Sequence, residues 1–184
     1  ACVPCWAPTD RVVSAGAPFR HFENKAALLT AVAEQAMERL TESVLEVLAA
    51  ARPCPALEAL AAIGTGYLSW ARDNPTHFRI ISSRERIDFH GSARLVAQNE
   101  ALRQILLAEV LRAQAEGSLR PGLTPEDVML SARAFVYGLA RMWVDGHFPE
   151  WQERRPPPEA MGAALDLFLS GISARPGQTP CSKA

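Results

Sequence analysis

The sequence lacks any hydrophobic stretch near the ~20 residues that a membrane-spanning helix requires. Its N-terminus also lacks the basic segment and long apolar stretch of a secretory signal peptide. The formal net charge is only −1, so no overall positive field draws the chain toward nucleic acid or an anionic membrane. Any binding to a polyanion therefore needs a local basic patch. We expect a globular, cytoplasmic protein without a membrane segment.

Cysteine is also scarce, because the chain has four in 184 residues. This is too few for a disulfide framework in a chain of this length. Cys2 and Cys5 have the spacing of a redox or zinc half-site, but no strand precedes them and no second ligand pair follows. His77, His90 and His147 stand far apart, each near a turn. We therefore predict no metal site and no cofactor.

Helical periodicity fills nearly every long segment, and no alternating strand pattern appears, which predicts an all-α fold of about six helices. Capping residues and breakers place these helices at residues 25–51, 55–73, 75–82, 93–116, 125–146 and 159–170. Asn24 and Thr124 are the clearest predicted caps, and Gly117 and Gly146 the clearest ends. The pattern turns Leu45 and Leu111 inward with their apolar neighbours, and it makes 64–66 a small-residue patch for close helix packing.

The most informative stretch is residues 13–29. Ser14 can cap a very short helix whose next residues are small (Ala15, Gly16, Ala17 and Pro18), so its backbone can approach another surface closely. Phe19 follows, and Arg20, His21 and Lys25 join Ser14 as donors suited to phosphate groups. A helix of this kind is typical of a recognition helix whose first turn enters the DNA major groove.

Residues 13–29 resemble the TetR (tetracycline-repressor-like) family of transcriptional regulators, at the junction between the recognition helix and the helix that links it to the body. The resemblance implies that Ser14, Phe19, His21 and Lys25 face phosphates. It places residues 15–18 nearest the bases, and Phe22 and Leu28 in the core. Residues 66–79 look like the ligand-sensing body of one subgroup, a weaker match.

The family's recognition helix follows two other helices. Here residues 1–12 contain Pro4 and Pro8 and no amphipathic pattern, so we expect a partial helix-turn-helix domain and weak, mostly non-specific DNA binding by this chain. We divide the chain into an incomplete DNA-binding domain with its linking helix (1–46), a C-terminal domain for effector binding and dimerisation (47–175), and a disordered tail (176–184).

Aromatic side chains recur in the predicted body. With the resemblance they predict a cavity for a small apolar or aromatic effector, whereas helical spacing alone fits an ordinary core. The candidates are Tyr67, Trp70, Phe78, Phe135, Tyr137, Leu139 and Trp143.

The resulting interpretation is a repressor that binds a double-stranded DNA operator, is released by the effector, and forms a homodimer through its last two helices. The alternative is a helical ligand-binding and dimerisation module that does not bind DNA. We do not expect an enzyme, because no Gly-x-Ser-x-Gly elbow or metal constellation is present. Glu85 and Asp88, flanked by Arg84 and Arg86, fit surface ion pairs better than acid–base catalysis.

Overall fold

A computed structural model describes residues 22–151 and 154–174. This part of the chain contains seven α-helices and no β-sheet; its single β-bridge joins Leu119 to Ser173. The all-α class is therefore confirmed. The helices are α1 (Lys25–Ala51), α2 (Ala56–Asp73), α3 (Pro75–Ser82), α4 (Ala93–Ala115), α5 (Pro125–Asp145), α6 (Phe148–Trp151) and α7 (Pro157–Ile172), with a 3₁₀ turn, η2 (Arg84–Arg86).

The helix ends follow the local chemistry of capping. The side chain of Asn24 accepts a 2.9 Å hydrogen bond from the N–H of Ala27, and Thr124 Oγ1 accepts one of 3.1 Å from the N–H of Asp127. Gly146 ends α5 in the left-handed region, with φ of 80°. The first five predicted helices are confirmed to within one residue at either end.

The end of the chain departs more from the prediction. The one-turn helix α6 was not predicted. Helix α7 begins two residues before the predicted 159–170 and ends two residues after it. Pro157 and Pro158 belong to its first turn, where backbone N–H groups have no partner within the helix, so proline costs nothing there. Gly171, the residue after the predicted end at 170, lies inside the last turn of α7.

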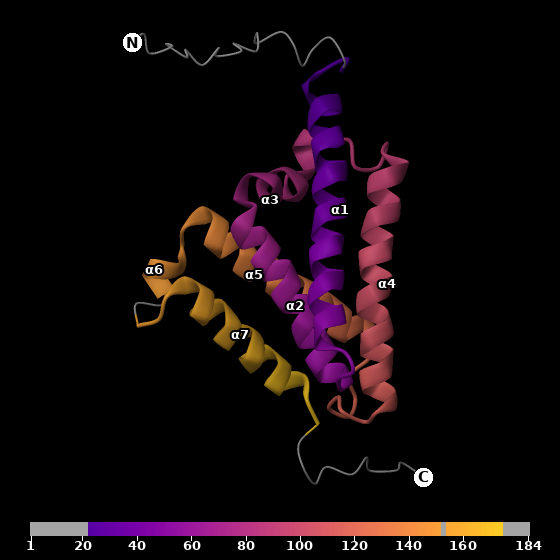
Figure 1. Ribbon diagram of the computed structural model, residues 1–184, viewed down its shortest axis with the longest axis vertical. Helices are drawn as coiled ribbons and strands as arrows, with labels where there is room; N and C mark the ends of the chain where they lie inside the picture. Colours follow the sequence, from indigo (N-terminus) through magenta and orange to yellow (C-terminus); the bar gives the residue numbers. More distant parts are fainter. Residues whose placement is uncertain (1–21, 152–153, 175–184) are drawn as a thin grey trace, which may run out of the picture.

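Close packing of α2 determines the arrangement of the bundle. Figure 1 shows α1 and α4 running side by side, with α2 against α1 and with α5 and α7 diverging from them. A Cβ atom at Gly66 would lie 2.9 Å from the Cα of Val44 in α1. A Cβ atom at Gly64 would lie 3.0 Å from the methyl carbons of Leu165 in α7. The predicted role of the 64–66 patch in close helix packing is confirmed.

The buried stripes of α1 and α4 are narrower than the sequence pattern indicated. On α1 the buried positions include Leu40, Val44 and Leu48. Leu45 is 45% exposed and Leu111 is 47% exposed, so the prediction that both point inward is wrong. Each directly follows a buried valine, and consecutive residues of a helix lie about 100° apart around its axis.

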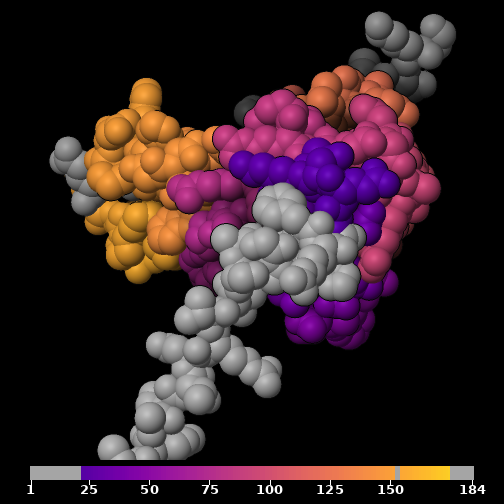
Figure 2. Space-filling model, turned by 90° about the horizontal axis from the view of Figure 1, so that it is seen from above, coloured from indigo at the N-terminus to yellow at the C-terminus, as the bar shows by residue number. Residues whose placement is uncertain are grey.

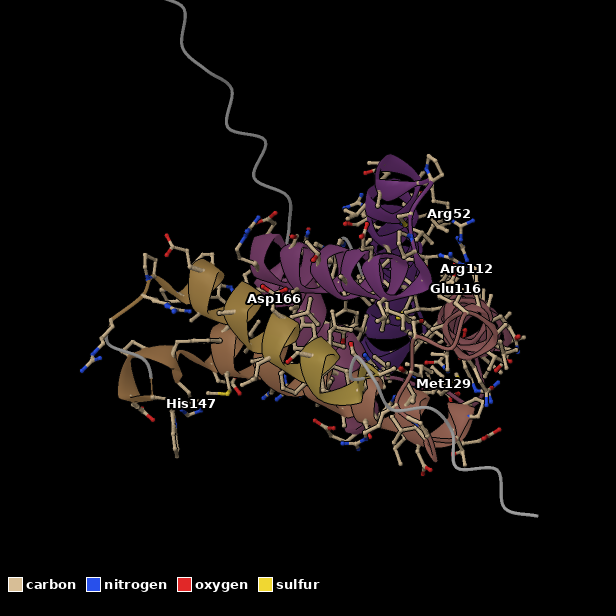
Figure 3. The ribbon with its side chains drawn as sticks, turned by 90° about the horizontal axis from the view of Figure 1, so that it is seen from below. Arg52, Arg112, Glu116, Met129, His147 and Asp166 are labelled. Atoms are coloured by element: carbon tan, nitrogen blue, oxygen red, sulfur yellow. The ribbon has the colours of Figure 1, made fainter. Side chains whose placement is uncertain are left out.

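An ionic cluster joins α4 to the end of α1. Glu109 is only 3% exposed, and it accepts hydrogen bonds from Arg52, the C-cap of α1, and from Arg112 at 2.8 Å. Arg112 also pairs with Glu116 at 2.8 Å, and Glu116 accepts a 2.9 Å hydrogen bond from the N–H of Ala56 at the start of α2. Figure 3 shows Arg52, Arg112 and Glu116 at this end of the bundle. The cluster fixes the ends of three helices to one another.

Candidate functional site

A cavity of about 370 Å³ lies among α1 to α5 and α7. Its walls are mainly apolar, with Met37 and Leu40 from α1, Ile63 from α2, Leu102 from α4 and Val136 from α5. The volume falls within the range of small-molecule sites, about 300–1,000 Å³. The walls therefore suit the apolar body of a small ligand.

Three aromatic rings form one connected wall of the cavity. Phe78 is fully buried, and its ring meets Tyr67 edge-on with 6.3 Å between the ring centres. The ring centre of Tyr137 lies 5.9 Å from that of Phe78. Burial raises the pKa of the Tyr67 hydroxyl above its ordinary value of 10.0, although Arg133 works in the opposite direction. Tyr67 therefore presents a neutral hydroxyl group at physiological pH.

Arg133 brings a positive charge to this aromatic wall from α5. Its Nη1 atom donates a 2.6 Å hydrogen bond to the hydroxyl oxygen of Tyr67. Its guanidinium carbon lies 5.2 Å from the ring centre of Tyr67 and 5.4 Å from that of Tyr137, within the range of cation–π attraction.

Arg84 brings a second positive charge, from η2. Its guanidinium carbon lies 3.2 Å from the ring centre of Phe89, and both side chains line the cavity. Burial lowers the pKa of Arg84 below its usual value, and the positive charge of Arg133 lowers it further.

Neither arginine has a carboxylate partner in residues 22–151 and 154–174. The other charged residues of the cavity lining are Arg103, which pairs with Glu100 at 3.1 Å, and Glu126, in the first turn of α5. The described part of the cavity therefore combines apolar walls with two unneutralised guanidinium groups.

The predicted ligand-binding residues separate into two groups. Tyr67, Phe78 and Tyr137 line the cavity, whereas Trp70, Phe135, Leu139 and Trp143 lie outside its lining. Trp70 is buried in the core. Leu139 is half-buried and packs against that core. The ring of Phe135 stacks on Phe168 with centres 4.8 Å apart, and the indole N–H of Trp143 donates a 3.4 Å hydrogen bond to the backbone oxygen of Arg72.

The helical repeat of α5 explains this separation. Met129, Arg133 and Tyr137 are four residues apart, and all three line the cavity. Phe135 and Leu139, also four residues apart, form a second apolar stripe on the far side of α5, because Phe135 is two residues, or about 200° of rotation, from Arg133 and from Tyr137. Residue type could not decide which stripe faces the cavity. An arginine between two apolar cavity positions is the signal that could have identified the first stripe, and sequence reasoning missed both Arg133 and Arg84.

The predicted DNA-binding residues lie almost wholly outside the described part of the chain. These are Ser14, Ala15, Gly16, Ala17, Pro18, Phe19, Arg20 and His21, and the tail 176–184 also lies outside it. Lys25 is described: it is the first residue of α1, and its side chain is exposed. Phe22 and Leu28, placed in the core by the resemblance, are half-buried.

The segment between α3 and α4, which contributes Arg84 and Phe89 to the cavity, is bonded to the first half of α1. The N–H of Asp88 donates a 3.0 Å hydrogen bond to Thr30 Oγ1, and Ser92 Oγ donates one of 2.7 Å to the carboxylate of Glu34. Figure 2, which views the molecule from the end where α1 begins, shows this part of the chain beside the indigo helix. The cavity wall is therefore connected directly to the helix that follows residues 13–24.

Residues 60–167 match the family described as "Tetracyclin repressor-like, C-terminal domain". The match covers more than half of the chain, which therefore belongs to the TetR family of transcriptional regulators. A search of curated protein sequences found no match. No helix in the described residues is long and apolar enough to cross a membrane. Within the same residues, no three His, Cys, Asp or Glu side chains are grouped as metal ligands would be.

Solved structures have the same fold. A protein of unknown function from Rhodococcus sp. RHA1 is 27% identical, with a TM-score of 0.70 over 88% of this chain and 80% of that chain. A regulatory protein in the tetR family from Rhodococcus RHA1 is 19% identical, with a TM-score of 0.68 over 88% and 81%. The TetR family transcriptional regulator PfmR from Thermus thermophilus is 17% identical, with a TM-score of 0.62 over 84% and 80%.

Proposed function

We propose that this protein is a ligand-responsive repressor: it binds operator DNA, and a small effector in the cavity releases it. The observation that carries the proposal is the connection between the cavity and α1, because the segment holding Arg84 and Phe89 is hydrogen-bonded to Thr30 and Glu34. A ligand that displaces this segment also changes the forces on α1. No catalytic step is assigned to the protein.

The predicted domain division assigns DNA binding and effector binding, the two functions that would be coupled, to different parts of the chain. Residues 1–46 would bind DNA and include most of the linking helix, and residues 47–175 would bind the effector and dimerise. The boundary falls within α1, which is continuous from Lys25 to Ala51. Because Met37, Leu40 and Val44 of α1 also line the cavity, one rigid helix belongs to both units.

DNA contacts are assigned to residues 14–21 and to Lys25. The exposed side chain of Lys25 stands at the N-terminal end of α1, where it can reach a phosphate beside the predicted recognition helix. Residues 15–18 would approach the bases. Such contacts are sequence-independent at Lys25 and sequence-dependent only in the short helix before it.

The homodimer is assigned to α5 and α7. Phe135 of α5 and Phe168 of α7 stack on each other while both remain half-buried, and Leu167 of α7 is 73% exposed. Apolar surface of this kind on two adjacent helices favours burial against the same surface of a second subunit. A two-fold dimer would also match a palindromic operator.

The test is a DNA selection followed by titration. The full chain is used to enrich duplexes from a random library, and an enriched duplex is then titrated by fluorescence anisotropy in the presence and absence of a cavity ligand. Because residues 1–12 show no amphipathic pattern, we expect weak, mostly non-specific binding with slight enrichment of a palindromic sequence, and still weaker binding when ligand is added. No DNA binding at all by a chain that still binds ligand would contradict the repressor function and favour the module that does not bind DNA.

A further inference from the structure

In the described part of the chain, two exposed arginines without a carboxylate partner stand beside the apolar cavity. Arg84 and Arg133 both line the cavity, and neither forms an ion pair with a carboxylate of the described residues. Two further charged residues line the cavity: Arg103, which pairs with Glu100, and Glu126. Two like charges beside one cavity are unfavourable unless a counter-charge joins them, and water screens part of this cost because both side chains are exposed.

The aromatic contacts offset part of this cost without neutralising either charge. Arg84 lies over the ring of Phe89, and Arg133 over the rings of Tyr67 and Tyr137. These contacts fix the orientation of the guanidinium groups. Planar, pre-oriented guanidinium groups are well suited to accept a carboxylate through paired N–H donors.

Tyr67 supplies a third donor at the same place. Its hydroxyl oxygen accepts the hydrogen bond from Arg133, so its own hydrogen remains available to an acceptor in the cavity. Because the hydroxyl group stays protonated at physiological pH, it adds a neutral donor to two cationic ones. Apart from the N–H that Arg133 donates to Tyr67, the donors of these two side chains can therefore meet an acceptor in the cavity.

We propose that the cavity binds an amphipathic carboxylic acid, with its carboxylate between Arg84 and Arg133 and its apolar body against Phe78 and the aliphatic walls. This inference rests on the proposed function, in which the cavity is the effector site, and it adds the chemical class of the effector. A neutral apolar compound would leave both guanidinium charges uncompensated, and a cation would be repelled by them.

The experiment compares two ligands of equal chain length and different charge. Decanoate and 1-decanol are titrated by isothermal calorimetry at pH 7.5 into the full chain and into three variants, Arg84→Gln, Arg133→Gln and Arg86→Gln. Glutamine retains a donor for Tyr67 at position 133. Arg86 is the matched control, because it belongs to the same 3₁₀ turn as Arg84 but lies outside the cavity lining and beside Glu85.

We expect decanoate to bind about ten-fold or more tightly than 1-decanol, the difference that one charge-assisted interaction provides. Arg84→Gln and Arg133→Gln should each weaken decanoate binding about ten-fold and leave 1-decanol unchanged, while Arg86→Gln leaves both affinities unchanged. Equal affinity for the two ligands in the unsubstituted chain would overturn the carboxylate inference and leave the effector site standing. Binding of neither ligand would contradict the effector site itself.

Discussion

Gly66 of α2 lies directly against the backbone of Val44 in α1, so that an added Cβ atom would stand 2.9 Å from the Cα of Val44. The obstacle is main chain, which cannot rotate away as a flexible side chain can. The two helices that form one side of the cavity are thus held at a separation that only glycine permits at this position.

Gly66→Ala should therefore lower the free energy of unfolding by about 1–3 kcal/mol, because the helices must separate to accept the methyl group. Urea denaturation followed by circular dichroism measures this change. Gly162→Ala is the matched control: it lies within α7 with no atom within 4 Å of an added Cβ, and we expect no loss or a gain of up to about 1 kcal/mol. Equal stability of the two variants would contradict the tight α1–α2 contact.

The second prediction concerns the dimer. Phe168→Glu places a charge beside Phe135 on the proposed interface, and it should convert a dimer at micromolar concentration to a monomer. Sedimentation velocity reports the change. Val96→Glu, at a position on α4 that is 42% exposed, adds the same charge outside the interface and should leave the dimer intact. A dimer that survives Phe168→Glu would place the interface elsewhere.

Tyr67 gives a prediction for alkaline pH. Its pKa is raised in the folded protein, so above pH 10 the unfolded chain releases this proton before the folded one does. Stability contributed by the neutral hydroxyl is therefore complete below pH 10 and is lost as pH rises through the folded-state pKa. The free energy of unfolding should fall less steeply between pH 9 and pH 10.5 in Tyr67→Phe than in the unsubstituted chain. Equal slopes would argue against the raised pKa.

Lys25 tests the assignment of DNA contacts. Lys25→Ala should weaken binding to specific and random duplexes by a similar factor, because a phosphate contact carries no sequence information. The slope of log affinity against log salt should become shallower by about 0.9, the effect of one phosphate contact. Anisotropy titrations at two salt concentrations measure both quantities. Loss of specific binding alone would instead assign Lys25 to base recognition.

The hydrogen bond between Thr30 and Asp88 tests the route of coupling. Thr30→Val removes the oxygen that accepts the N–H of Asp88, so it should reduce the factor by which decanoate weakens DNA binding while leaving decanoate affinity nearly unchanged. Thr41→Val is the control, because the Thr41 hydroxyl bonds only within α1, to the carbonyl of Met37. If both variants respond to decanoate as the unsubstituted chain does, the route through Asp88 is wrong.

Most helix boundaries could be predicted because their causes are local. Asn24 and Thr124 each cap the start of a helix, and Gly146 caps the end of one, through contacts within three or four residues. The cavity has no such local cause. Tyr67 and Phe78 were predicted to line an effector pocket and both line the cavity, but the choice between the two apolar stripes of α5 depends on how α5 packs against α2. Arg84 stands in the three-residue 3₁₀ turn η2, which is too short for hydrophobic periodicity to indicate the orientation of a side chain.

The 27 residues of α1 extend over about 40 Å at 1.5 Å per residue. Its last turn is anchored, since its C-cap Arg52 is bound to the buried carboxylate of Glu109. Thr30 and Glu34, which accept hydrogen bonds from the segment between α3 and α4, lie near the opposite end of α1. The helix therefore has the geometry of a lever with its fulcrum at the ionic cluster. A tilt of about 5° about that fulcrum would move Lys25 by about 3.5 Å, close to the ~3.4 Å rise of one base pair. A displacement too small to open the bundle would thus move Lys25, the residue proposed to contact a phosphate, by a distance comparable to one base-pair step.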